Sequence, residues 1–239
     1  MLSTEDPGRQ VHIHPASTGV PLNSRHATLS RHHSMPYQKA QSTMDQTSRT
    51  QDQQHPTDLQ HIWIITGPAG CGKSTVGENL SKALNMDFLE GDNQYHPDAN
   101  KEKMKNCIPL TDEDRWDWLI SLRDAAVESL QTHSSVVVAC SALKKKYRDV
   151  MRVAAYNHPS VKIHFIYLSA SFQVIFERVK RREDHYMSEK MVKSQFDALE
   201  EPDQNSEQDA VTVSTENVTK DEVQQEVLRR VDGIMAEYQ

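Results

Sequence analysis

The sequence predicts an α/β fold in which a parallel β-sheet is covered by helices on both faces. Short apolar runs with the character of buried strands alternate with longer segments whose apolar residues recur at helical spacing. Strands that alternate with helices pair in parallel, because the helices provide the crossover connections. A second observation is that no apolar stretch approaches the roughly 18 residues of a membrane span. We therefore expect a globular α/β domain and no membrane partner.

Composition divides the chain of 239 residues near residue 60. Residues 1–60 are rich in Ser, Thr, Gln, His and Pro, lack apolar periodicity, and carry as many basic as acidic residues. Such a segment buries too little apolar surface to offset the entropy lost on ordering. We predict a disordered N-terminal tail over 1–60 and one folded domain over 61–239, which is long enough for a single core.

Charge and cysteine content limit the possible partners and the compartment. Because the tail is neutral, the net charge of −7 belongs to the domain, and an acidic domain argues against a nucleic-acid partner. The three cysteines, Cys71, Cys107 and Cys140, have no metal-ligand spacing. So few cysteines, without a signal peptide, favour a reducing compartment, and we expect a cytoplasmic protein.

The expected strands are short and apolar, and the clearest are the runs 62–65 and 136–140. The five expected strands cover 62–66, 86–90, 136–140, 163–168 and 211–213. The expected helices show one apolar face each, as in the last one, where Val223, Val227 and Val231 recur at helical spacing. They cover 73–84, 98–105, 112–131, 142–156, 171–182, 188–199 and 220–237. In such sheets ligands bind beyond the carboxyl ends of the strands.

A glycine-rich loop joins the first strand to the first helix. Strand, loop and helix in this order are the context of a phosphate-binding P-loop, in which backbone N–H groups and the helix N-terminus surround phosphate oxygens. In this reading Lys73 reaches the β- and γ-phosphates and the Ser74 hydroxyl holds Mg²⁺. The loop consists of Gly67, Pro68, Ala69, Gly70, Cys71, Gly72, Lys73, Ser74 and Thr75. These residues predict binding of a nucleoside triphosphate.

Asp92 is the first candidate for the chemistry itself. It follows the second strand, so it faces the same crevice as Gly67. A carboxylate there can accept the proton of an attacking hydroxyl or hold that hydroxyl in line with the γ-phosphate. The alternative is a loop aspartate that hydrogen-bonds its own backbone. Cys71 lies near a helix N-terminus, which predicts a lowered thiol pKa.

Cationic residues gather in the segments that leave the second and third strands. Most are expected on solvated helix faces. If Lys103, Arg115 and Arg148 point inward, the second substrate is an anion held by arginine contacts. The basic segment 178–185 joins two helices and suits a mobile lid, at about 178–190, whose cations stabilise charge on the transferred group. The alternative is an exposed basic helix end.

Several motifs together resemble the gluconokinase family. They cover most of 61–239 and none of the tail, and they go well beyond the P-loop that many kinases share. The matching residues are Gly91-Asp92-x-x-x-His96-Pro97-x-x-Asn100-x-x-Lys103-Met104, Pro109-Leu110-Thr111-Asp112-x-Asp114-Arg115-x-x-Trp118-Leu119, Cys140-Ser141-Ala142-Leu143-Lys144-x-x-Tyr147-Arg148-Asp149, Phe165-Ile166-Tyr167-Leu168, Arg182-x-x-His185-x-Met187 and Ser194-Gln195-Phe196-x-x-Leu199-Glu200.

The resemblance implies a P-loop kinase of three α/β/α layers, with a five-stranded parallel sheet and a mobile lid, that makes 6-phosphogluconate from gluconate and ATP. It implies that Asp92 activates the gluconate 6-hydroxyl, that Arg182 and His185 belong to the lid, as a catalytic and a substrate-binding residue, and that relatives often form homodimers. The implied sugar-acid pocket contains His96, Lys103, Arg115 and Arg148. The residues implied near adenine are Thr215, Asn217 and Val218.

Three positions depart from the family's usual pattern. Cys107 and Asp184 stand where glycine is usual, and Asp117 stands where proline is usual. A side chain in place of glycine introduces strain wherever the backbone needs a positive φ. Two alternatives therefore stay open: a related kinase for another hydroxy acid such as shikimate, and a catalytically impaired nucleotide-binding regulatory protein. A guanine-nucleotide switch is disfavoured because the chain has no Asn-Lys-x-Asp motif.

Overall fold

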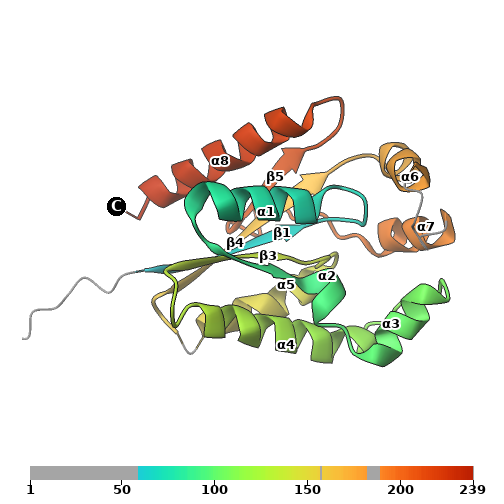
Figure 1. Ribbon diagram of the computed structural model, residues 1–239, viewed down its shortest axis with the longest axis horizontal. Helices are drawn as coiled ribbons and strands as arrows, with labels where there is room; N and C mark the ends of the chain where they lie inside the picture. The colour runs from blue at the N-terminus through green and yellow to red at the C-terminus, as the bar shows by residue number, and fades with distance from the viewer. Residues whose placement is uncertain (1–58, 157, 182–188, 239) are drawn as a thin grey trace, which may run out of the picture. The chain divides into compact units, whose positions relative to one another are not determined.

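A five-stranded sheet organises the part of the chain that the computed structural model describes, which is residues 59–156, 158–181 and 189–238 (Figure 1). All strand pairs are parallel, and the strand order is β2-β3-β1-β4-β5. The strands are β1 (Gln60–Thr66), β2 (Asp87–Glu90), β3 (Ser135–Ala139), β4 (Val161–Ser169) and β5 (Ala210–Ser214). The five-stranded parallel sheet predicted from the alternating sequence pattern is confirmed.

Alternation along each strand divides the core into two layers. In β1, Ile62 and Ile64 belong to one buried cluster, whereas Trp63 and Ile65 belong to the other. Successive side chains of a strand point to opposite faces, so a strand that is apolar throughout must be covered on both sides. This explains why the run 62–65 has no polar residue.

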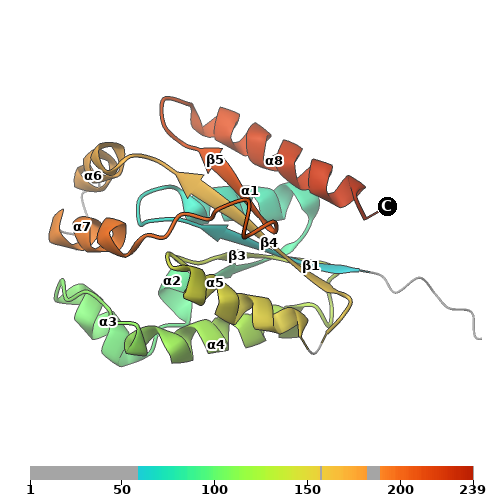
Figure 2. The same cartoon turned by 180° about the vertical axis from the view of Figure 1, so that it is seen from behind.

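The helices cover both faces of the sheet, as Figures 1 and 2 show from opposite sides. Residues of α1, α6, α7 and α8 pack in the cluster with Trp63, and residues of α4 and α5 pack in the cluster with Ile62. The helices are α1 (Lys73–Leu84), α2 (Gly91–Gln94), α3 (Asp98–Lys105), α4 (Glu113–Ser129), α5 (Lys145–Arg152), α6 (Phe172–Lys180), α7 (Glu189–Ala198) and α8 (Lys220–Ala236), with a 3₁₀ turn η1 (Val153–Ala155) after α5.

Two local details differ from the expected elements. The segment after β2, for which no helix was expected, forms the short helix α2, whose four residues are too few to show an apolar periodicity. The helix expected over 142–156 begins only at Lys145, because Ser141–Leu143 continue away from β3 in non-helical backbone, and it gives way to η1 at Val153.

The predicted tail and most of the predicted lid lie outside the described residues. The tail falls almost entirely in 1–58, and of the segment 178–190 only the end of α6, Arg181 and the start of α7 are described. Both therefore stay predictions. Within the described residues, no helix combines the length and the apolar character that crossing a membrane requires.

Helix α3 ends in a left-handed turn that contains Cys107. The Ile108 N–H donates to Lys103 O at 2.9 Å and the Cys107 N–H donates to Met104 O at 3.0 Å, which is the Schellman pattern of a helix C-terminus. In this pattern glycine usually occupies the left-handed position, yet here Cys107 has φ +56°. Cys107, which stands where the family usually has glycine, therefore has the positive φ at which a side chain introduces strain.

We expect the substitution Cys107→Gly to raise the free energy of unfolding by about 0.5–1 kcal/mol, as relief of left-handed strain exceeds the added chain entropy. Urea unfolding measures the change. The neighbouring substitution Asn106→Gly is the control, because Asn106 has φ −88° and no such strain to lose. Equal destabilisation by both glycines would contradict this account of Cys107.

Candidate active site

The loop after β1 has the backbone of a phosphate cradle. Gly67, Gly70 and Gly72 all have positive φ, at +141°, +90° and +106°. A Cβ on Gly67 would lie 2.8 Å from Leu168 O, and one on Gly70 would lie 2.8 Å from a methyl carbon of Val179. Positions 67 and 70 therefore require glycine both for its backbone conformation and because a Cβ has no space there. The loop leads directly into α1, whose first residue is Lys73, so the P-loop geometry predicted for Gly67–Thr75 is present.

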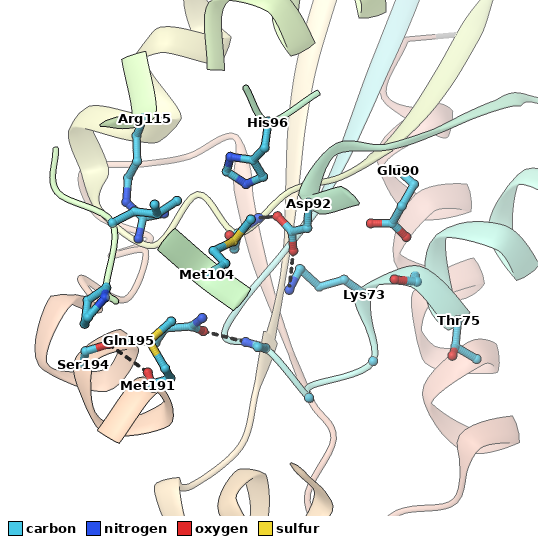
Figure 3. Close-up of a pocket in the computed structure, with 17 residues that line it drawn as sticks. Lys73, Thr75, Glu90, Asp92, His96, Met104, Arg115, Met191, Ser194 and Gln195 are labelled. Atoms are coloured by element: carbon cyan, nitrogen blue, oxygen red, sulfur yellow. Dashed lines mark hydrogen bonds and ion pairs between the residues drawn. The ribbon is translucent and has the colours of Figure 1, made fainter. Parts of the chain in front are cut away.

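Lys73 and Asp92 meet at the carboxyl ends of the strands. Lys73 Nζ lies 3.0 Å from Asp92 Oδ2, and the Ser141 N–H donates to Asp92 Oδ1 at 2.9 Å (Figure 3). The three residues follow β1, β2 and β3, which are neighbours in the sheet. The Lys73 side chain is only 6% exposed, and that of Asp92 is 26% exposed.

The ion pair keeps both groups charged. Burial alone would lower the pKa of Lys73, but the adjacent Asp92 carboxylate outweighs it and raises that pKa. Burial would raise the pKa of Asp92, but the Lys73 ammonium and the Ser141 N–H outweigh it and lower that pKa below its usual range. An ionised carboxylate therefore stands beside the phosphate loop at neutral pH.

A cavity of about 180 Å³ opens over this pair, and we call it the Asp92 cavity. Four parts of the chain surround it: the P-loop, the ends of β2 and β3, the segment from α2 to α4, and α7 (Figure 3). Its lining residues are Ala69, Gly70, Gly72, Lys73, Ser74, Thr75, Glu90, Asp92, His96, Met104, Pro109, Leu110, Arg115, Ser141, Met191, Ser194 and Gln195.

His96 and Arg115, both predicted in the sugar-acid pocket, lie in the wall of this cavity. The His96 ring stacks on Trp118 with centroids 4.1 Å apart, and burial lowers the pKa of His96 to about 4, so the imidazole is neutral at pH 7. Among the described residues, Arg115 Nε is one of the few buried side-chain atoms without a hydrogen-bond partner. An orphaned guanidinium N–H at a cavity wall fits a site for an anion.

Glu90 is a site residue that sequence reasoning missed. It ends β2, lines the Asp92 cavity, and its Oε1 is buried without a hydrogen-bond partner among the described residues. Burial raises the pKa of Glu90, although a hydrogen bond from Ser74 opposes the shift. Hydroxyl and carboxylate oxygens are the ligands that Mg²⁺ prefers, so Ser74 and Glu90 fit a metal beside the triphosphate. The sequence signal that could have identified Glu90 is its position two residues before Asp92, at the carboxyl end of a strand.

A second cavity, of about 520 Å³, lies on the other side of the P-loop, and we call it the Thr215 cavity. Gly70, Gly72 and Thr75 line both cavities. Thr215 and Val218, two of the three residues implied near adenine, line it, and Asn217 does not. Arg178 lines it as well, with Nη1 donating to Thr215 Oγ1 at 3.0 Å. Arg178 was recognised only as part of the basic segment 178–185.

Arg148, implied in the sugar-acid pocket by the resemblance, does not line the Asp92 cavity, and its contacts point to a different role. It is 1% exposed and forms a two-bond pair with Glu207, at 2.6 and 2.8 Å. Its Nη1 also donates to the carbonyls of Ala142, Leu143 and Glu200. Arg148 therefore anchors the segment 200–207 against α5, a structural role that the motif around it does not reveal.

We expect Arg148→Met to lower the free energy of unfolding by about 3–5 kcal/mol, because Glu207 is left buried with part of its compensation removed. Urea unfolding measures this loss. Arg123→Met, which removes a pair between the partly buried Arg123 and the exposed Asp124, should change stability by less than about 1 kcal/mol. An Arg148 variant of normal stability with an impaired acceptor KM would return Arg148 to the binding site.

Lys103 also lies outside the lining of the Asp92 cavity. Its Nζ donates to Asp114 Oδ1 at 2.6 Å, and Asp114 in turn accepts hydrogen bonds from Thr111. Lys103 thus connects α3 to the start of α4 through Asp114, the residue that precedes Arg115. Its contacts favour a supporting position and do not bring it into the cavity.

The lowered thiol pKa predicted for Cys71 is wrong. The thiol is 3% exposed, and burial raises its pKa despite the nearby Lys73 ammonium. Desolvation favours the neutral thiol more than the helix N-terminus and the lysine favour the thiolate. Arg182 and His185, predicted in the lid, lie outside the described residues.

Comparison with known proteins identifies relatives of the domain. Residues 69–232 match the family model of shikimate kinase. A probable gluconokinase of Schizosaccharomyces pombe is 39% identical over 187 residues, which cover 77% of this chain and 95% of that protein. The thermoresistant gluconokinase of Escherichia coli is 42% identical over 142 residues, covering 59% of this chain and 78% of that protein.

A solved structure agrees with these relatives. The crystal structure of a gluconokinase from Sinorhizobium meliloti 1021 has a TM-score of 0.61 and 34% sequence identity, and covers 76% of this chain and 98% of that chain. The P-loop, the Lys73–Asp92 pair and the five-stranded parallel sheet are therefore found in a chain whose relatives are kinases. This chain belongs to the gluconokinase family, within the shikimate kinase group of P-loop kinases.

Proposed function

We propose that this protein transfers the γ-phosphoryl group of ATP to the 6-hydroxyl of D-gluconate, giving 6-phospho-D-gluconate and ADP. The observation that carries the proposal is the Lys73–Asp92 pair, set where the P-loop separates two cavities. One cavity suits a nucleotide and the other a small anionic acceptor. The reaction would serve gluconate catabolism that feeds the pentose phosphate pathway.

ATP is assigned to the P-loop and the Thr215 cavity. The loop glycines and the N-terminus of α1 surround the phosphates, and Lys73 neutralises charge on the β- and γ-phosphates. The base is assigned to the Thr215 cavity, where the Arg178 guanidinium, held by Thr215, offers a planar cationic surface to the ring. Mg²⁺, held by Ser74 and Glu90, would neutralise charge on the β- and γ-oxygens.

Gluconate is assigned to the Asp92 cavity. The Asp92 carboxylate accepts a hydrogen bond from the 6-hydroxyl and aligns it with the γ-phosphate. Its low pKa makes it a weak base, which suits a loose transition state in which the attacking hydroxyl loses its proton late. The neutral His96 offers hydrogen bonds to substrate hydroxyls, and the orphaned Arg115 Nε supports a contact with the substrate carboxylate.

Shikimate is the alternative acceptor, because the matching family model describes shikimate kinase. Gluconate is favoured because the relatives 39–42% identical to this chain are gluconokinases. A homodimer, a cytoplasmic location and the absence of nucleic-acid partners are predictions from the resemblance and the composition, and they stay so.

An ADP-release assay with a panel of acceptors tests the proposal. The panel contains gluconate, other aldonic acids, shikimate and nucleoside monophosphates, each with ATP and Mg²⁺. We expect gluconate to give the highest kcat/KM. Turnover of shikimate alone would establish the alternative acceptor, and no turnover of any acceptor by a folded protein that binds ATP would favour a regulatory role.

A further inference from the structure

Helix α7 contacts the P-loop directly through Gln195. The Ala69 N–H donates to Gln195 Oε1 at 2.7 Å, although the two residues lie 126 positions apart in the chain. Both residues line the Asp92 cavity, and the Gln195 side chain extends from α7 toward the P-loop (Figure 3). No part of the function proposed above uses this contact.

The contact fixes which way the Gln195 amide is turned. A backbone N–H only donates, so the atom that faces Ala69 must be the amide oxygen. The Nε2 group, with its two N–H donors, is then directed away from the Ala69 amide and into the cavity. It is a neutral donor beside the P-loop, in a cavity that also holds the acceptor carboxylates of Asp92 and Glu90.

The helix that carries Gln195 is firmly packed. Met191 and Val192 are buried, and the Phe196 ring meets Phe172 edge to face with centroids 5.4 Å apart. Ser194 Oγ donates to Met191 O at 2.8 Å within the same helix. The packed helix fixes the base of the Gln195 side chain, and the Ala69 N–H fixes its amide. A side chain fixed in this way loses little entropy when its Nε2 binds a ligand oxygen.

We propose that Gln195 is a further catalytic residue of the kinase reaction, an inference that rests on the proposed function. Its Nε2 donates a hydrogen bond to an oxygen of the transferring phosphoryl group, while the Ala69 N–H holds the amide in the orientation that this donation needs. Negative charge on the phosphoryl oxygens then meets a preorganised donor in addition to Lys73. The P-loop thus orders a residue of α7 as well as the phosphates.

Two other roles for the contact lead to different results. If Gln195 only tethers α7 to the loop, any side chain that accepts from Ala69 N–H will replace it. If Gln195 instead competes with phosphate for that N–H, removing it will tighten nucleotide binding and leave kcat unchanged. The variants Gln195→Met and Gln195→Glu separate these roles, because methionine removes donor and acceptor whereas glutamate keeps the acceptor.

The test measures kcat with gluconate, the slow hydrolysis of ATP without gluconate, the Kd for ADP and the melting temperature. We expect Gln195→Met to lower kcat and ATP hydrolysis by the same factor, about 10–100-fold, with the Kd for ADP within about threefold of wild type. The rates of gluconate phosphorylation and of ATP hydrolysis fall together, because gluconate and water attack the same phosphoryl group. Gln195→Glu, which keeps the tether, should lose at least as much kcat.

The control is Lys193→Met, which removes an exposed pair with Asp197 on the same helix and should leave all four quantities unchanged. The inference is overturned by wild-type kcat in Gln195→Glu, by tighter ADP binding with unchanged kcat in Gln195→Met, or by loss of gluconate transfer with full ATP hydrolysis. If Gln195→Met does not fold, Gln195→Glu alone decides. A wild-type protein that does not phosphorylate gluconate would refute the proposed function instead.

Discussion

Replacing Lys73 with methionine should lower kcat by about 10³-fold or more while the protein stays folded. The Lys73 ammonium is the charge that the P-loop presents to the phosphates, and removing such a charge from a water-poor site costs more than removing one neutral donor. The remaining Asp92 is partly exposed and keeps its hydrogen bond from Ser141, so the stability loss should stay below about 2 kcal/mol. Steady-state ADP release and thermal unfolding measure the two effects.

The matched control is Lys82→Met, which removes an exposed lysine from the last turn of the same helix. It should leave kcat and stability unchanged. The Lys73 variant should also have a different pH profile, because the pKa of Asp92 rises without the ammonium. As the pH is lowered, Asp92 is then protonated earlier, so the residual activity is lost at a higher pH than in wild type. Wild-type activity in Lys73→Met would refute the P-loop assignment.

Replacing Asp92 with asparagine should lower kcat by at least about 10²-fold. Asparagine retains the shape of the side chain, but its amide cannot take a proton and competes as a donor with the attacking hydroxyl. ATP binding should change much less, because the substitution leaves the loop glycines and Lys73 in place. The measurements are kcat with gluconate and the Kd for ATP or ADP.

Asp98→Asn is the control for Asp92, because Asp98 is a fully exposed carboxylate at the start of α3. It should have wild-type kinetics. A raised KM for gluconate with unchanged kcat in Asp92→Asn would make Asp92 a binding group rather than the group that orients and deprotonates the hydroxyl.

Local sequence patterns predicted the sheet and the centre of the site for a physical reason. In a parallel sheet the carboxyl ends of the strands share one edge, so Gly67 and Asp92 had to face the same crevice once their strands were recognised. The Lys73–Asp92 contact at 3.0 Å agrees with that reasoning. The end of α1 at Leu84 and the bounds of α3 were predicted to the residue, because apolar spacing and flanking turns are local signals.

Other features depended on contacts between distant segments. Arg148 was expected in the pocket because its motif is basic and follows β3, but its partner Glu207 lies 59 residues away in sequence. Gln195 meets Ala69 across 126 residues, and no periodicity reports such a contact. The raised pKa of Cys71 followed from burial, which outweighs the local effects of the helix N-terminus and Lys73.

The measurement that tests the central claim most directly is a phosphorus NMR spectrum of the products from ATP, Mg²⁺ and D-gluconate. We predict a new phosphomonoester signal coupled to the methylene protons at C6, with one equivalent of ADP and no ester when shikimate replaces gluconate. ADP formed together with inorganic phosphate alone, or an ester on a secondary hydroxyl, would contradict the assignment of Asp92 and the cavity above it to the gluconate 6-hydroxyl.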